Sequence, residues 1–242
     1  MFKHYLFRLI GRILIFALVV WVYFNHHTFI WEIIYFQPFA QFGWVHILWV
    51  LLVINLALHL FPNKLITMAG GKQFSKFYQP TANPPERLKL LEAVRQQNIR
   101  AWIIMAIWLS AHALIAFIYL AGLIGRAELF LLFVFYFMAD LICLLVFCPF
   151  QTFGFKNKCC IDCRIFNWGH FLMYTPLAIM GGFFAWSLFF LACAVLIRWE
   201  VAYARYPERF FDNNNTALGC SGCTEKICSI KKPLAKKFLS KK

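Results

Sequence analysis

The sequence is poor in charged residues. Only 14% of its 242 residues are Asp, Glu, Lys or Arg, whereas 62% are hydrophobic; a typical soluble domain has about 25% charged and about 45–50% apolar residues. Acidic residues are the scarcer kind, with 10 Asp and Glu against 24 Lys and Arg. This composition excludes an ordinary soluble domain and indicates a polytopic membrane protein with an all-α transmembrane region.

Several familiar signals are missing. No nucleic-acid-binding motif accompanies the positive charge, so nucleic acid is not an expected partner; basic residues that collect in cytoplasmic loops explain the charge. The stretch after Arg12 lacks a small-residue cleavage site and continues into Trp21, so we expect a retained first span rather than a signal peptide. No arrangement of Ser, His, Asp and Cys indicates a nucleophilic enzyme, and the sequence leaves enzymatic activity open.

The apolar segments predict about six membrane-spanning helices, since one span needs about 20 apolar residues. The expected spans are residues 6–24, 43–60, 101–123, 128–150, 166–181 and 183–203. Residues 1–206 would form this helical domain, and 207–242 a basic, cysteine-rich tail that packs with the loop 151–165.

The last apolar stretch, residues 165–203, decides the topology. Pro176 and the pair Gly181-Gly182 favour two helices joined by a turn over one long span. Two spans place 23 of the 24 basic residues on one side and only Arg126 on the other. Because basic residues favour the cytoplasmic side, we expect a multi-pass protein of the cell (inner) membrane with both termini in the cytoplasm. The basic end of the tail is then expected to contact anionic lipid headgroups.

A helix start is also predicted before the third span. Asn83 can cap a helix, Pro84 suits its first turn, and Glu86 follows three residues after the cap. The segment from there to Arg100 is interpreted either as a cytoplasmic amphipathic helix lying on the membrane or as an ordinary helical connector.

Six cysteines occur in two groups that the predicted topology places on the cytoplasmic side. They are Cys159, Cys160 and Cys163 in the loop after the fourth span, and Cys220, Cys223 and Cys228 after the last span. Cys148, at the end of the fourth span, is a further candidate member. A hairpin formed by the last two spans would bring the two groups to the same membrane face.

Thiolates in a reducing cytoplasm favour metal binding over disulfides. Two Cys-x2-Cys pairs match a four-cysteine zinc site, whereas the surplus of cysteines favours an iron–sulfur cluster. A third interpretation is a group of thiols that binds no metal. The leading hypothesis is an iron–sulfur electron-transfer protein or subunit, with a redox partner or other membrane subunits. The alternative is a zinc-stapled transporter or scaffold subunit.

Ionisable residues inside predicted spans are functional candidates, because charge is costly in lipid. His112 and Asp140 are expected at nearly equal depth, as a hydrogen-bonded pair that is either functional or structural. His46 and His59 lie 13 residues apart on the second span and are candidate haem ligands. Haem itself is not expected, because no second helix carries a matching pair.

Overall fold

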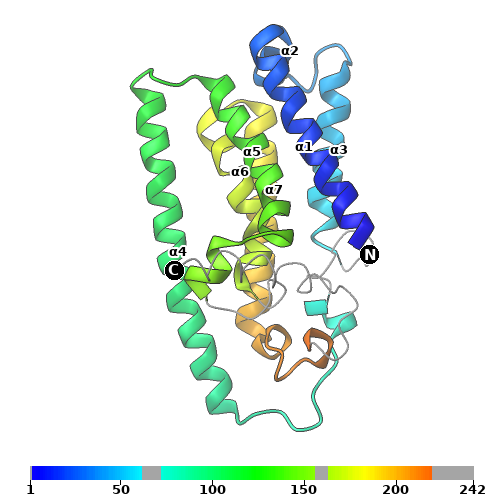
Figure 1. Cartoon of the computed structure of the whole chain (residues 1–242), viewed down its shortest axis with the longest axis vertical. Helices are drawn as coiled ribbons and strands as arrows, with labels where there is room; N and C mark the ends of the chain where they lie inside the picture. Colours follow the sequence, from blue (N-terminus) through cyan, green and yellow to red (C-terminus); the bar gives the residue numbers. More distant parts are fainter. Residues whose placement is uncertain (1, 62–71, 156–162, 220–242) are drawn as a thin grey trace.

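The computed structural model describes residues 2–61, 72–155 and 163–219, which are predominantly helical, and the long helices run along the long axis of the molecule (Figure 1). The α-helices are α1 (Phe2–Asn25), α2 (His27–Ile34), α3 (Trp44–Leu58), α4 (Arg87–Leu120), α5 (Arg126–Leu145), α6 (Gly169–Met180) and α7 (Phe183–Arg205). Short helical turns are η2 (Ser75–Phe77), η3 (Phe150–Phe155), η4 (Arg164–Trp168), η5 (Pro207–Phe210) and η6 (Thr216–Leu218). An isolated β-bridge joins Pro80 to Asn215.

Four helices in this part of the chain are long and apolar enough to cross a membrane: α1, α4, α5 and α7. Their outer faces carry large apolar side chains in the open, such as Trp102 and Phe117 of α4, which are 73% and 68% exposed. Exposed apolar surface on this scale is unusual for a soluble monomer and suits contact with lipid. The architecture is therefore that of a multi-pass membrane protein.

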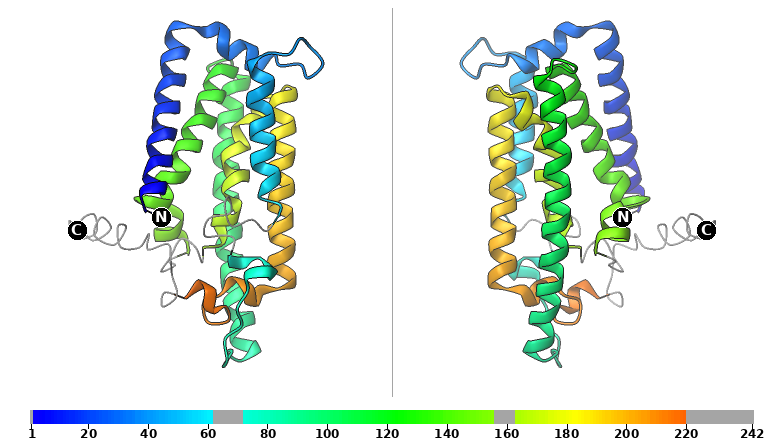
Figure 2. Two further views of the ribbon diagram at one scale, coloured as in Figure 1. Left: turned by 90° about the vertical axis from the view of Figure 1, so that its right-hand side faces the viewer. Right: turned by 90° about the vertical axis from the view of Figure 1, so that its left-hand side faces the viewer.

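Two of the six predicted spans are shorter than expected. Helix α3 has 15 residues and α6 has 12, which correspond to about 22 Å and about 18 Å at the rise of an α-helix. Neither length crosses a hydrocarbon core of about 30 Å. The chain nevertheless alternates in direction as predicted, with α3 beside α7 and α1 beside α5 (Figure 2).

The fourth predicted span also ends early, at Leu145 instead of residue 150. Pro149 explains this end, because a proline ring clashes with the carbonyl four residues before it and lacks the N–H that would bond there. The chain continues through the π-helical turn η3, and the next α-helix in the described part of the chain, α6, begins at Gly169. Irregular backbone at such a depth is tolerated where it is buried in protein or lines a cavity.

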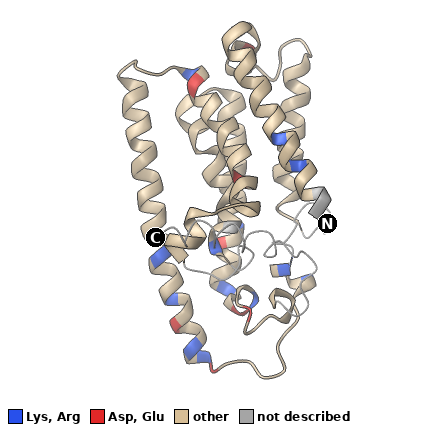
Figure 3. Ribbon diagram, in the orientation of Figure 1, with Lys and Arg blue, Asp and Glu red and all other residues tan. Residues whose placement is uncertain are grey.

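The predicted amphipathic helix is not a separate element on the membrane surface. Its residues form the first part of α4, which runs without a break for 34 residues (Figure 1). The helix begins at Arg87 instead of Pro84, because Pro85 disfavours the α conformation of the residue before it. Charged residues occupy the first part of α4, and none occurs from Ala101 to Leu120 (Figure 3).

The predicted hairpin between the last two apolar helices is confirmed. Gly181 and Gly182 join α6 to α7 with φ angles of 74° and 89°, in the left-handed region that glycine reaches at little cost. An added Cβ at Gly182 would lie 3.1 Å from the carbonyl oxygen of Ile34. The turn therefore needs glycine for its conformation and for close packing under α2.

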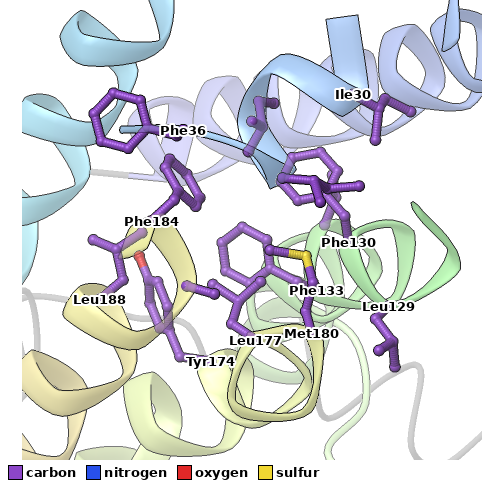
Figure 4. Close-up of a cluster of buried hydrophobic side chains, with 14 of the residues drawn as sticks. Ile30, Phe36, Leu129, Phe130, Phe133, Tyr174, Leu177, Met180, Phe184 and Leu188 are labelled. Carbon is purple, nitrogen blue, oxygen red and sulfur yellow. The ribbon is translucent and has the colours of Figure 1, made fainter. Parts of the chain in front are cut away.

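The main core lies where α5, α6 and α7 meet the end of α2 (Figure 4). Phe133 and Tyr174 are in ring contact at 4.9 Å, and Phe36 packs against Phe184 at 6.1 Å. Seven of the twelve residues of α6 are buried, which makes this short helix an internal element. Helices α1 and α4 are peripheral, because only 6% and 11% of their most apolar windows are buried.

Candidate functional site

A cavity of about 320 Å³ opens among α1, α5, α6 and the end of α3. Its walls are largely apolar, but ionisable and thiol side chains converge on it from separate elements. Those residues are Arg8, Arg12, His59, Tyr136, Asp140, Cys143, Cys148, Cys163 and His170. A largely apolar cavity with a few convergent polar groups is the usual form of a ligand site.

An ion pair at this cavity joins α1 to α5. Arg12 Nη1 donates to Asp140 Oδ2 at 2.8 Å and to the carbonyl oxygen of Phe137 at 2.6 Å. The Arg12 guanidinium also lies 4.1 Å from the centroid of the Phe137 ring. Asp140 is 43% exposed in its side chain and Arg12 is 21% exposed, so the pair faces the open part of the cavity.

Asp140 also lies at the beginning of α6. A Cβ added at Gly169, the first residue of α6, would be 3.3 Å from Asp140 Oδ1. The missing side chain lets the carboxylate approach the N-terminal end of the helix, where the partial positive charge of the helix dipole favours an anion. Arg12 and this helix end together explain how a carboxylate is held on α5 between its neighbours α1 and α6.

Two histidines also line the cavity. The rings of His59 and His170 are 4.1 Å apart and nearly edge-to-face. His59 Nδ1 lies 2.7 Å from the carbonyl oxygen of Asn55. A carbonyl oxygen accepts but cannot donate, so Nδ1 of His59 carries the hydrogen and its Nε2 is the acceptor. His170 Nδ1 is buried and has no hydrogen-bond partner within the described residues.

The predicted hydrogen bond between His112 and Asp140 is not formed. His112 is 4% exposed, and its Nδ1 bonds to the carbonyl oxygen of Trp108 at 3.0 Å. Its ring packs on Trp108 and Tyr136, which themselves line the cavity. His112 therefore supports the cavity wall, whereas Asp140 reaches the interior.

The candidate haem ligands His46 and His59 lie at opposite ends of α3. His46 Nδ1 accepts a hydrogen bond from the backbone N–H of Gly43 at 3.1 Å, which caps the start of the helix. The neighbour of His59 is His170, and their ring contact does not fit a haem. Two imidazoles on opposite faces of one iron, each about 2.0 Å from it, would hold their centroids farther apart than 4.1 Å.

Two of the seven candidate metal ligands lie in the described part of the chain. Cys148 and Cys163 are 8% and 3% exposed, and both line the cavity. In the sequence, Cys148 precedes residues 156–162 and Cys163 follows them. The others, Cys159, Cys160, Cys220, Cys223 and Cys228, lie outside the described residues. No cluster of three or more ligating side chains occurs among the residues that are described.

Arg164, next to Cys163, connects three elements. Its guanidinium forms an ion pair with Glu200 of α7, donates to Asn98 of α4, and lies 4.1 Å from the ring centroid of Tyr203. Trp168 Nε1 also donates to Glu200, at 2.7 Å. This network fixes the backbone that carries Cys163 against α7.

Among the cavity residues that the sequence analysis does not predict, Arg12 and His170 make the closest contacts with predicted ones. The signal for Arg12 was present: it is a basic residue inside the first apolar segment, and Asp140 is an acidic one inside the fourth. Opposite charges within spans tend to pair. His170 had no comparable signal, because its place beside His59 depends on the early end of α5 and the late start of α6.

Comparison with protein-family models, with curated proteins and with solved structures finds no match to this chain.

Proposed function

We propose that the protein is a membrane redox protein in which the cytoplasmic cysteines bind an iron–sulfur cluster beside the polar cavity. The observation that carries this proposal is that Cys148 and Cys163, from separate elements, line the cavity that also contains Arg12, Asp140 and the histidines. Thiolates and ionisable groups at one site suit electron transfer accompanied by proton transfer. A cluster bound there would supply one-electron chemistry.

The position of residues 207–219, the described start of the tail, supports the same proposal. Tyr203, which contacts Arg164, also packs against Phe210 at 5.0 Å. Phe210 belongs to the segment that leads to Cys220, and Arg164 directly follows Cys163. The contacts therefore bring the chain before Cys220 and the chain after Cys163 to the same end of the bundle, as a shared metal centre requires.

The polar residues of the cavity would handle protons. His59 presents Nε2 as an acceptor because Asn55 fixes its tautomer, so it can take a proton from a ligand in the cavity. Asp140 is held by Arg12 at the partly exposed side of the cavity, where its carboxylate can accept a hydrogen bond from a ligand. Tyr136 and Trp108 close the cavity toward His112.

The alternative is a zinc-stapled transporter or scaffold subunit, in which the cysteines tie the tail to the loop. The observation in its favour is that Arg164, Glu200 and Trp168 already stabilise this end of the protein by polar contacts, as a structural metal would do. The cavity would then bind a transported ligand, with Asp140 as its functional carboxylate and His112 in its supporting wall.

The deciding measurement is the iron, acid-labile sulfide and zinc content of the full chain purified without oxygen, with a visible absorption spectrum. We expect iron and sulfide in similar amounts and a broad visible band. Cys160→Ser and Cys220→Ser should each remove the iron. Cys193→Ser, in α7, is the matched control and should retain it. One zinc per chain and a colourless sample would contradict the redox proposal and support the zinc staple.

A further inference from the structure

A second hollow, of about 500 Å³, lies between the C-terminal end of α7 and the segment around η2. Four basic side chains line it, and no acidic side chain does. These are Lys76, Arg198, Arg205 and Arg209. None of the four forms an ion pair within the described residues, where the recorded pairs involve other cations. The hollow therefore concentrates positive charge without a counter-charge of its own.

The basic residues converge because of their spacing. Arg198 and Arg205 are seven residues apart on α7, so they lie on one face, two turns from each other. Val201 and Ala202 lie between them on the same face and form the floor of the hollow. Arg205 in the last turn also offsets the negative end of the helix dipole, but this accounts for one of the four cations.

Both walls of the hollow are held by one buried side chain. Asn215 is completely buried, and its Nδ2 donates to the carbonyl oxygens of Lys72 at 3.2 Å and Arg209 at 2.9 Å. Its Oδ1 accepts from the backbone N–H of Gln79 at 3.3 Å. The segment before and after η2 is thereby fixed to the segment that carries Arg209. The shape of the hollow is therefore stabilised by specific hydrogen bonds of Asn215.

Aromatic rings orient the guanidinium groups. Arg209 lies 3.9 Å from the ring centroid of Tyr206, and Arg198 lies 5.9 Å from that of Phe74. A guanidinium held near a ring still has several N–H donors that a ligand can use. Those N–H groups suit phosphate, which an arginine can bind with two parallel hydrogen bonds.

The depth of the hollow indicates where the phosphate comes from. Arg198 is the first charged residue of α7, after the uncharged stretch 183–197. The hollow thus begins where the apolar part of a candidate span ends, which is the level of lipid headgroups. We propose that this hollow binds the phosphomonoester headgroup of an anionic membrane lipid.

The test uses the purified full chain in a neutral detergent. The protein is titrated with short-chain phosphatidic acid, and native mass spectrometry counts the lipid molecules bound to each chain. Phosphatidylcholine of the same chain length and water-soluble glycerol 3-phosphate are the two comparison ligands. We expect saturable binding of phosphatidic acid and weak binding of the other two. Equal binding of glycerol 3-phosphate would overturn the assignment to lipid.

Two double variants, one from each wall, test the residues. Arg198→Gln with Arg205→Gln, and Lys76→Gln with Arg209→Gln, should each weaken binding about thirty-fold. This estimate takes about 1 kcal/mol for each basic residue near a membrane surface and 1.4 kcal/mol for a factor of ten. If one double variant does not fold, the other still tests whether the basic residues of the hollow bind the lipid phosphate.

The matched control is Arg87→Gln with Lys89→Gln, which removes two exposed cations from the start of α4, away from the hollow. Binding should remain unchanged in this control. If binding of phosphatidic acid fell as much in this control as in the hollow variants, general charge attraction would explain the binding. That result would overturn the proposed site. The metal content of the hollow variants should equal that of the unmodified chain, so this proposal and the redox proposal can fail separately.

Discussion

At the scale of single residues, the pairing of Arg12 with Asp140 joins charges on two candidate spans and should contribute measurably to stability. Each charge would be costly alone inside an apolar bundle, and the contact at 2.8 Å lets each compensate the other. Asp140 is further favoured by its place at the start of α6. Both side chains remain partly exposed, so the coupling is expected to be smaller than that of a fully buried pair.

A double-mutant cycle measures this coupling. Arg12→Gln and Asp140→Asn should each destabilise the protein, because each leaves an unpaired charge at the cavity. The double variant should recover about 1–2 kcal/mol of the summed loss, between the values for membrane hydrogen bonds and for buried ion pairs. Reversible unfolding in mixed micelles gives the free energies. Simple additivity of the two single losses would show that the residues act independently.

The sequence could predict the ionisable residues of the cavity better than their partners. Asp140 was recognisable as an intramembrane charge, but His112 was assigned to it only because both were expected at similar depth. Depth along a helix does not specify the direction of a side chain around it. In the structure, Asp140 turns toward α1 and α6, whereas His112 bonds to the backbone of its own helix through Trp108.

At the scale of elements, prolines and glycines determine where several helices end and turn. The Gly181-Gly182 turn was predicted because glycine pairs mark reversals of direction. The early end of α5 also has a clear signal in Pro149, but the apolar run continues past it and favours a longer span. The short length of α6 could not be predicted, because it depends on burial against neighbouring helices, which the sequence does not specify; seven of its twelve residues are buried.

The α6–α7 turn gives a prediction about strain and packing. Gly182→Ala should cost more stability than Gly122→Ala, although both glycines have positive φ angles, 89° and 74°. A Cβ at Gly122 would meet nothing within 4 Å, whereas one at Gly182 would lie 3.1 Å from the carbonyl oxygen of Ile34. We expect about 1–2 kcal/mol for the left-handed conformation alone at Gly122, and a larger loss at Gly182. Equal losses, measured as unfolding free energies, would show that α2 can move aside.

At the scale of the whole molecule, charge is distributed unevenly along the bundle axis. The start of α4 and the end of α7 carry many of the described basic residues and extend beyond the apolar parts of their helices (Figure 3). The turn between α4 and α5, with Arg126, lies at the other end (Figure 1). If this asymmetry follows the positive-inside rule, the end that contains both hollow and cavity faces the cytoplasm.

Trypsin treatment of sealed membrane vesicles tests this orientation. Inside-out vesicles should be cut at Arg87 and Lys89, which are exposed at the start of α4. Right-side-out vesicles should protect both sites and leave only Arg126 accessible. Opening the vesicles with detergent is the control for equal cleavage. Cutting at Arg87 from the outside would reverse the orientation and place the cysteines in an oxidising compartment, where disulfides would replace the metal centre as the expected state of the thiols.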